Sequence, residues 1–184
     1  PLAAERRRGE KVVTAEQLGG PRAQMQQSGV VHFLAENDEE AAFLCRRLLS
    51  FLPSNNLEDP PRLQWDEMPD RDEAMNSIVP EDPKQGYDVR NVIARIVDNG
   101  DFLEVQPLYA TNVVVGFARL TGRSIGVIAN QPCVMAGALD INASDKVSRF
   151  VRFCNAFNIP LVTLVDVPGC MPGVQQEYGG IIRH

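Results

Sequence analysis

The 184-residue chain contains very little histidine and no paired cysteine motif. Its two histidines, His32 and His184, leave almost no raw material for a histidine-based metal site or a catalytic triad. No two of its four cysteines stand at C-x-x-C spacing, which argues against a zinc cluster or a thioredoxin motif, so we expect no metal site. The sequence also lacks G-x-G-x-x-G and Walker A motifs, so a Rossmann unit or a P-loop has no support.

Long apolar runs and an excess of positive charge are absent as well. No window reaches the roughly 18 apolar residues of a membrane-spanning helix, and the N-terminus lacks the apolar core of a signal peptide. With 18 Lys and Arg against 24 Asp and Glu, the net charge is -6, so we expect neither nucleic acid nor a membrane as a partner. Because Pro1 replaces an initiator Met and His184 follows a helical pattern directly, we expect an internal fragment of a longer protein.

The cysteines that are present have apolar neighbours, as in RFVRFCNAF. Such surroundings favour buried, reduced thiols in a cytosol-like compartment. We therefore expect a structural role for all four: Cys45, Cys133, Cys154 and Cys170.

Proline divides the chain into three parts. Residues 53–87 hold six of the 13 prolines and predict a surface-running connection. Residues 1–52 form a first folded piece, and residues 88–184 form a second piece that is richer in β-branched and apolar residues. We therefore expect parts of two domains joined by a linker.

Hydrophobic periodicity predicts alternating helices and strands. Helices are expected over 38–51, 88–98 and 142–157, with Asn37, Asp88 and Asn142 at their starts, and another from about Gln175. Strands are expected over 102–105, 112–120, 124–130 and 161–167, with a tight turn at 121–122. The continuous apolar run 161–167 is typical of a strand covered on both faces. The pattern predicts an α/β layered fold.

The Pro-Gly bend after this last strand, DVPGCMPG, is the best candidate for chemistry. Gly and Pro there leave backbone N–H groups free, and such groups can stabilise a negative oxygen without a titrating side chain. The alternatives are structural: Gly169 and Gly173 can serve as turn residues only, and Asp166 can cap the loop rather than catalyse. The segment 136–138 fits a tight turn and a backbone pocket equally well, and we expect Gly179 and Gly180 near a helix start, packed against a strand.

Several long blocks, in order, resemble one family. They are LGGPRAQMQQSGVVHFLAENDEEA, RRLLSFLPSNNLEDPP, YDVRNVIARIVDNGDFLEVQPLYATNVVVGFARLTGR, and the stretch from ANQPCVMAGALD to the end. Together they resemble the carboxyltransferase β subunit of biotin-dependent acyl-CoA carboxylases, of the propionyl-CoA and acetyl-CoA carboxylase type. Within the bend, the family usually has PGFLPGTDQEYGG, from which Cys170 and Met171 depart.

This resemblance implies a fold and an activity. The fold is a crotonase-like (ClpP-type) ββα superhelix, with 1–52 ending an N-terminal carboxyltransferase domain, 53–87 as the interdomain linker and 88–184 beginning a C-terminal one. The activity is transfer of a carboxyl group from carboxybiotin, held on a partner carrier protein, to the α-carbon of propionyl-CoA or acetyl-CoA. Biotin left by CO2 release would take the α-proton, while two backbone oxyanion holes, formed by glycines outside this chain, would steady the developing charges. By itself the chain is expected to be inactive.

The resemblance also implies site residues and partners. Residues 98–131 would line the acyl-CoA, including Phe102, Asn130 and Gln131. The bend would lie on the biotin side, with the residues Pro168, Gly169, Pro172 and Gly173. Partners would be a biotin carboxylase and biotin carrier subunit, in which the carboxylase uses ATP, and further copies in a hexamer of β subunits. Location would be the cytoplasm of a bacterium or the mitochondrial matrix of a eukaryote.

Two other functions remain open. The chain can be a non-catalytic segment that contributes CoA or subunit contacts, as the substitutions in the bend suggest. It can also belong to a crotonase-type acyl-CoA enzyme such as a hydratase, although that chemistry calls for a Glu pair over the acyl chain, and no such pair is evident.

Overall fold

A four-stranded sheet lies at the centre of the molecule. The computed structural model describes residues 14–65, 72–82 and 85–184, and its strands pair in the order β1-β2-β3-β4. They are β1 (Phe102–Val105), β2 (Val113–Leu120), β3 (Arg123–Asn130) and β4 (Leu161–Leu164). The pairs β1–β2 and β2–β3 are antiparallel, whereas β4 runs parallel to β3. The first three strands confirm the predicted ranges to within one residue.

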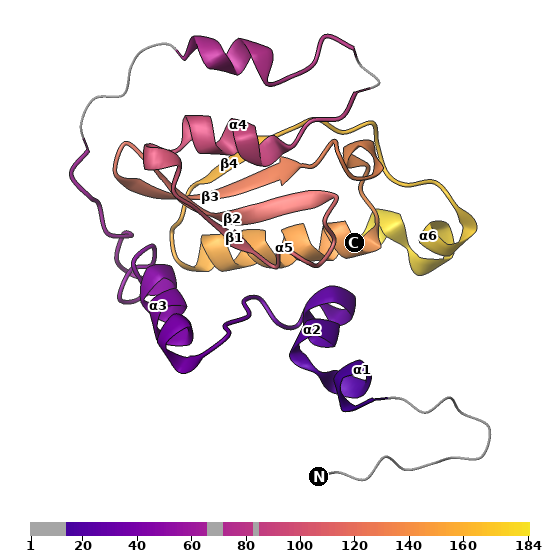
Figure 1. Cartoon of the computed structure of the whole chain (residues 1–184), viewed down its shortest axis with the longest axis horizontal. Helices are drawn as coiled ribbons and strands as arrows, with labels where there is room; N and C mark the ends of the chain where they lie inside the picture. Colours follow the sequence, from indigo (N-terminus) through magenta and orange to yellow (C-terminus); the bar gives the residue numbers. More distant parts are fainter. Residues whose placement is uncertain (1–13, 66–71, 83–84) are drawn as a thin grey trace.

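Helices cover both faces of this sheet. Helix α4 (Val89–Ile96) lies on one face and α5 (Ile141–Ala156) on the other, as Figure 1 shows. Helix α5 makes the crossover that two parallel strands require, because a tight turn cannot join them. The α/β layers predicted from the sequence are therefore present. The other helices are α1 (Ala15–Gly19), α2 (Pro21–Ala23), α3 (Asp38–Leu49) and α6 (Val174–Gly179), with shorter or irregular turns η1 (Gln24–Ser28), η2 (Glu73–Ser77), η3 (Asp98–Gly100), η4 (Met135–Gly137) and η5 (Ile181–Arg183).

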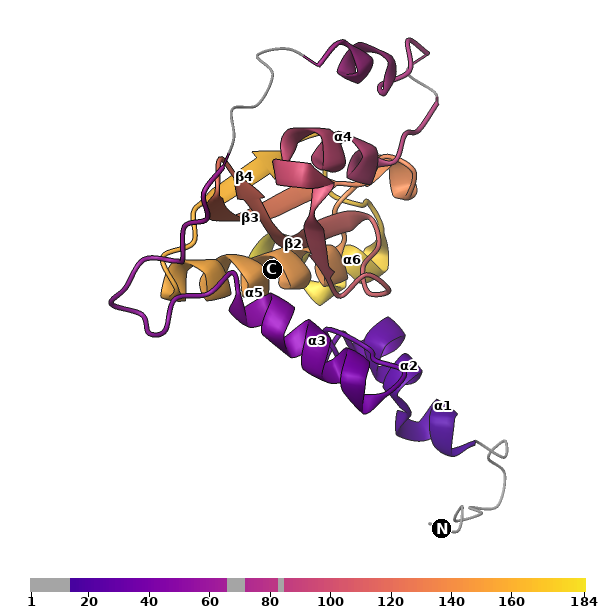
Figure 2. The ribbon, with the colours of Figure 1, turned by 60° about the vertical axis from the view of Figure 1, so that its left-hand side comes forward.

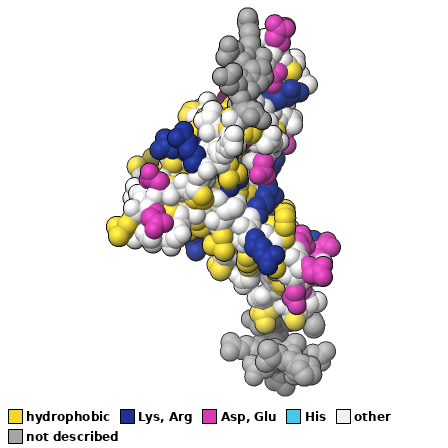
Figure 3. All heavy atoms as spheres, turned by 90° about the vertical axis from the view of Figure 1, so that its left-hand side faces the viewer, with side chains coloured by type: hydrophobic (Ala, Val, Ile, Leu, Met, Phe, Trp, Pro, Cys, Tyr) yellow, Lys and Arg dark blue, Asp and Glu magenta, His cyan; other side chains and the backbone are white. Residues whose placement is uncertain are grey.

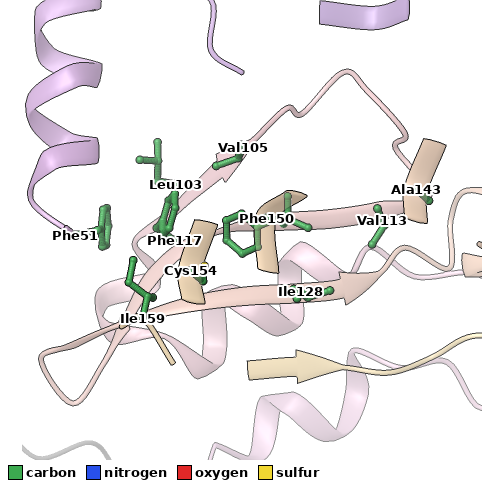
Figure 4. Packing of buried hydrophobic residues seen from close by; sticks show 11 residues of the cluster. Phe51, Leu103, Val105, Val113, Phe117, Ile128, Ala143, Phe150, Cys154 and Ile159 are labelled. Atoms are coloured by element: carbon green, nitrogen blue, oxygen red, sulfur yellow. The ribbon is translucent and has the colours of Figure 1, made fainter. Parts of the chain in front are cut away.

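Two apolar clusters hold the layers together, one on each side of the sheet. On the α5 side, the Phe117 ring lies 5.1 Å from the Phe150 ring and 6.0 Å from the Phe51 ring, centroid to centroid (Figure 4). On the α4 side, Ile93 packs in a cluster with Val114. Each fully buried side chain of this size stabilises the fold by about 1.5–3 kcal/mol. Strands β2 and β3 contribute to both clusters and are therefore buried along most of their length.

The N-terminal part of the chain contacts the core on one side of the sheet. Figures 1 and 2 both show α1, α2 and α3 on the α5 side. Phe51, just after α3, is fully buried in the α5-side cluster, and Leu44 and Leu48 pack against that cluster. The Arg119 guanidinium lies over the Phe51 ring, 4.2 Å from its centroid. The first piece is thus anchored to the second through Phe51 and its neighbours, and also before α3, where Gln106 donates to the carbonyls of Gly29 and His32.

The helix starts confirm two predictions and correct a third. The Asn37 side chain accepts a hydrogen bond from the Glu40 N–H (2.9 Å), and the Asp88 side chain accepts one from the Arg90 N–H (2.9 Å), as the capping patterns predict. The expected start of α5 at Asn142 is wrong. Asp140 caps this helix instead, because its carboxylate accepts the Ala143 N–H at 2.9 Å.

Strand β4 is less covered than the sequence predicts. It ends at Leu164, and Leu161 is 38% exposed, so the expectation of a strand covered on both faces over 161–167 is wrong. The reason is its place at the edge: among the described residues it pairs only with β3. Beyond it, Gly179 and Gly180 end α6 rather than begin it. Gly180 has φ 84, the left-handed conformation common after a helix, and a Cβ at Gly179 would meet Ile141 rather than a strand.

Three cysteines contradict the expectation of burial. Cys154 is fully buried in the α5-side cluster, and burial raises the pKa of its thiol to about 12. The exposed thiols are Cys45, Cys133 and Cys170. They follow apolar neighbours in the sequence, but Cys45 lies on the outer side of α3, and the other two lie in loops. Apolar neighbours therefore did not predict burial outside α5.

Hydrophobic side chains also reach the surface in several places. Figure 3 shows them between charged groups on one face of the molecule. The most exposed near the C-terminus are Val165 (71%), Tyr178 (89%) and Ile182 (85%), and Phe43 of α3 is 61% exposed. None of the helices in the described ranges has both the length and the apolar character needed to cross a bilayer.

Candidate functional site

Polar side chains gather where the parallel strands β3 and β4 end. Strand β3 ends at Asn130 and β4 ends at Leu164, at the same edge of the sheet. The turn 131–139 follows the first strand and the bend 165–173 follows the second. In α/β sheets ligands bind in the crevice outside the carboxyl ends of the strands. We therefore take this carboxyl edge as the candidate functional site.

Asn130 and Gln131 shape the edge from within. Asn130 is 8% exposed; its amide donates to the Gly137 carbonyl (3.0 Å), and its oxygen accepts the Asp166 N–H (3.3 Å). Gln131 is 1% exposed; its oxygen accepts the Val89 N–H at the start of α4 (3.1 Å), and its amide donates to Asp88 (2.7 Å). Both predicted acyl-CoA residues lie at the site, where their side chains hold backbone in place.

Phe102 lies away from these two residues. It begins β1 and is paired with Ala118, whereas Asn130 is paired with Val113 near the other end of β2. Its ring packs against the α4-side cluster and fills the space above Gly116, where a Cβ would come 2.6 Å from the ring carbons. The structure therefore brings together two of the three predicted residues and places the third at the far end of the sheet.

The Pro-Gly bend lies beside the turn that follows β3. The Leu139 N–H donates to the Gly169 carbonyl (3.1 Å), and the Met171 N–H donates to the Leu139 carbonyl (2.7 Å). Pro168, Pro172 and both glycines, Gly169 and Gly173, are exposed. Within the described part of the chain, the N–H groups of Gly169, Cys170 and Gly173 have no protein acceptor. The bend thus presents the free backbone donors that the sequence predicts.

The turn after β3 is strained. Met135, Ala136 and Gly137 follow one another at φ 51, 53 and 76, so two residues with side chains adopt the left-handed conformation. Gly137 also approaches the bend closely, because a Cβ there would lie 2.6 Å from the Asp166 carbonyl oxygen. The sequence fits both a tight turn and a backbone pocket at 136–138, and the structure shows a tight turn packed against the bend.

Tyr87 and Asp166 join distant parts of the chain at this edge. The Tyr87 hydroxyl donates to Asp166 Oδ2 at 2.8 Å. Burial, together with this hydrogen bond to the carboxylate, raises the pKa of Tyr87 to about 12. The Asp166 carboxylate thus anchors the segment that leads into α4. No local sequence pattern could reveal this pair, since 79 residues separate its members.

Asp88 keeps its charge at the same edge. Burial opposes its ionisation, but hydrogen bonds from Gln131 and from the Arg90 backbone outweigh burial, so the pKa of Asp88 lies below its ordinary value. The Arg90 guanidinium also makes a two-point contact with Glu104, at 2.7 Å from each carboxylate oxygen. These pairs fix the start of α4 against β1.

A cavity of about 420 Å³ lies elsewhere, on the α5 side of the sheet. Its walls are mostly aromatic and aliphatic, with His32, Gln106 and Arg149 as polar members. Burial, and then the charge of Arg149, lowers the pKa of His32. No local pattern in the sequence predicts this cavity, because its lining comes from the loop before α3 and from α3, β1, the residue after β1, β2 and α5. Nowhere in 14–65, 72–82 or 85–184 do three or more His, Cys, Asp or Glu side chains gather as metal ligands would.

The sequence is similar to known carboxyltransferase subunits. The family described as Carboxyl transferase domain matches residues 1–184. The methylmalonyl-CoA decarboxylase subunit alpha of Veillonella parvula is 59% identical over 94% of the chain and 34% of its own length. The methylmalonyl-CoA carboxyltransferase 12S subunit of Propionibacterium freudenreichii subsp. shermanii is 59% identical over 94% of the chain and 33% of its own length. The propionyl-CoA carboxylase beta chain of Roseobacter denitrificans is 51% identical over 94% and 34%.

The fold is similar as well. A crystal structure of transcarboxylase 12S, described as a hexamer assembly with hydrolysed methylmalonyl-coenzyme A bound, superimposes with a TM-score of 0.91 at 59% identity. It covers 95% of this chain, and this chain covers 34% of it. The likeness confirms the expected crotonase-like α/β fold. The chain spans about one third of the length of these relatives.

Proposed function

Because the chain belongs to the carboxyl transferase domain family, we propose that it forms part of an enzyme that moves a carboxyl group between biotin and the α-carbon of propionyl-CoA. This carboxyl transfer converts propionyl-CoA into methylmalonyl-CoA or the reverse. These two acyl-CoAs are the ones in the names of the relatives described above. Acetyl-CoA is the alternative acceptor. The observation that carries the proposal is the identity of 59% with a methylmalonyl-CoA carboxyltransferase across nearly the whole chain.

The free backbone donors of the Pro-Gly bend suit this chemistry. Carboxylated biotin supplies the carboxyl group, and its ureido oxygen gains negative charge when that group leaves. N–H groups without a protein acceptor, at Gly169, Cys170 and Gly173, can donate to such an oxygen. Pro168 and Pro172 limit the conformations of the bend and so keep these donors in place. We assign the bend to the biotin side of the site.

Asn130 and Gln131 act as positioning residues on the acyl-CoA side. Their side chains fix the turn 131–139 and the start of α4, so the backbone at this edge is held ready for a thioester. Phe102, at the far end of the sheet, would contact a part of the CoA that lies away from Asn130 and Gln131. The segment divisions at 52 and 87 belong to the same proposal.

The partners follow from the chemistry. A biotin-bearing carrier subunit delivers the carboxyl group, and a biotin carboxylase subunit uses ATP to load it. Exposed apolar side chains such as Tyr178 and Ile182 would be covered by further protein in a hexamer of β subunits. We place the enzyme in the cytoplasm of a bacterium or in the mitochondrial matrix.

A chimeric subunit tests the proposal. The matching third of the Propionibacterium freudenreichii 12S subunit is replaced by this chain, and carboxyl transfer is measured with acetyl-, propionyl- and butyryl-CoA as acceptors. We expect transfer, with propionyl-CoA preferred. The unchanged 12S subunit is the control for assembly and assay. A chimera that assembles and binds CoA but transfers nothing would favour the non-catalytic binding or assembly function instead.

A further inference from the structure

Lys146 is a buried cation that the candidate site does not explain. It lies in α5 and is 2% exposed. Its ammonium donates to four backbone carbonyls, at 2.8 Å to Tyr109, 2.9 Å to Val113, 3.1 Å to Gln106 and 3.4 Å to Ala110. No carboxylate in the described ranges forms an ion pair with it. Carbonyl dipoles therefore supply the direct contacts to this charge, and the Glu104 carboxylate favours it from a distance.

The arrangement has the chemistry of a monovalent-cation site. An ammonium has three N–H donors, so four carbonyl oxygens share them around one small positive charge. Rings of backbone carbonyls hold potassium ions in the same way, by replacing the water around the ion. Burial lowers the pKa of Lys146 to about 8, so the amine still carries its proton at neutral pH. Lys146 thus places a tethered ammonium where a free ion could otherwise bind.

Three of the four carbonyls belong to the loop that joins β1 to β2, and the fourth, that of Val113, begins β2. This loop turns through Gln106 (φ 52) and Ala110 (φ 43), two left-handed residues with side chains. The turns direct its carbonyls toward one point, where their dipoles would repel one another without a cation. Such a strained loop persists only when its surroundings fix it. The ammonium of Lys146 supplies that constraint.

The loop is connected directly to the candidate site. Asn112, between Ala110 and Val113, accepts the Gln131 N–H through its carbonyl at 3.0 Å. Its side-chain amide donates to the Ala138 carbonyl (2.7 Å) and to Asp140 (3.2 Å). Asn112 therefore bridges the loop to both ends of the strained turn. A shift of the loop would move the turn that packs against the Pro-Gly bend.

We propose that Lys146 is a positioning residue whose ammonium, acting as a built-in monovalent cation in a carbonyl cage, holds the β1–β2 loop and, through Asn112, the 131–138 turn. The consequence for carboxyl transfer rests on the proposed function, but the cage itself does not. Two separate measurements therefore test the two parts.

The first measurement is cation rescue in the 184-residue chain. Lys146→Ala opens space in the cage, and we expect a lower melting temperature and faster hydrogen exchange over 106–113 and 131–138. Ammonium chloride should reverse both changes, whereas tetramethylammonium chloride at equal ionic strength should not, because it is too large. Lys146→Met fills the space without charge and should show no rescue. Equal effects of both salts, or normal exchange in Lys146→Ala, would overturn the proposal.

If Lys146→Ala does not fold, Lys146→Gln keeps N–H donors without the charge. It should fold, with faster exchange confined to the same two segments. Faster exchange spread evenly over the sheet would indicate a general loss of stability and would contradict the positioning role.

The second measurement is kinetic and uses the chimeric subunit. We expect Lys146→Ala to lower kcat/KM for carboxyl transfer by up to about 100-fold, as misplaced reacting groups do, with recovery in ammonium. Arg149→Ala, one turn further along α5, is the control and should show no ammonium dependence. Unchanged kinetics in an active Lys146→Ala chimera would overturn the link to the site. An inactive parent chimera would count against the proposed function. The hydrogen-exchange experiment would still test whether the Lys146 ammonium holds the carbonyl cage.

Discussion

Replacing Asn130 tests how the carboxyl edge is held together. Its side chain joins the strained turn to the Pro-Gly bend by two hydrogen bonds, one to the Gly137 carbonyl and one from the Asp166 N–H. Asn130→Ala leaves both backbone groups without partners. A buried group without its partner costs about 1–3 kcal/mol, so we expect the free energy of unfolding to fall by about 2–5 kcal/mol.

Asn130→Asp removes only the donor of this pair of hydrogen bonds. The carboxylate still accepts the Asp166 N–H, but it sets a second oxygen against the Gly137 carbonyl and adds a charge to a buried site, so we expect this variant to be at least as destabilised as Asn130→Ala at neutral pH. Urea unfolding followed by circular dichroism measures both variants. Asn155→Ala, an exposed change on α5, is the control and should stay within about 0.5 kcal/mol of the parent chain. An Asn130→Ala variant as stable as this control, or an Asn130→Asp variant as stable as the parent chain, would refute the reasoning.

Three further predictions concern single groups. Thiol labelling at pH 8 should modify the three exposed cysteines quickly and leave Cys154 unmodified until the chain unfolds. The reason is that burial raises the pKa of the Cys154 thiol to about 12. Labelling of all four cysteines at one rate would contradict this. Between pH 10 and 12 the unfolded chain loses the Tyr87 proton while the folded chain retains it, so the free energy of unfolding should fall as the pH rises. In urea titrations, Tyr87→Phe should remove that part of the fall. Asp98→Ala should destabilise the chain by about 2–5 kcal/mol, because the Asp98 carboxylate accepts the Thr121 and Gly122 N–H groups. A loss under about 1 kcal/mol in urea unfolding would count against this contact with the turn.

Local patterns in the sequence predict the elements well. The capping residues Asn37 and Asp88 and the turn 121–122 are determined by contacts a few residues away, so the sequence reveals them directly. The start of α5 was misplaced because Asp140 and Asn142 are both competent caps, and only the backbone course decides between them. Strand β4 has an apolar sequence, but its cover depends on which elements lie beside it.

Contacts between distant segments could not be predicted in this way. Tyr87 meets Asp166, and Lys146 meets the β1–β2 loop, only because the sheet brings their elements together. The resemblance pointed to Asn130 and Gln131 as site residues, and the structure does place them at the carboxyl edge. Their buried hydrogen bonds to backbone depend on the three-dimensional arrangement alone.

The central claim is that backbone N–H groups of the Pro-Gly bend, rather than side chains that titrate, stabilise charge during carboxyl transfer. Cys170 offers the most direct measurement, because its N–H has no acceptor within the described chain. The two backbone hydrogen bonds of Leu139 are made with Gly169 and Met171, on either side of Cys170. In the chimeric subunit, Cys170→Ser keeps this N–H and should retain the rate of carboxyl transfer. Cys170→Pro removes it and should lower that rate by about 100-fold. Loss of transfer in the serine variant, or full activity in the proline variant, would contradict the claim.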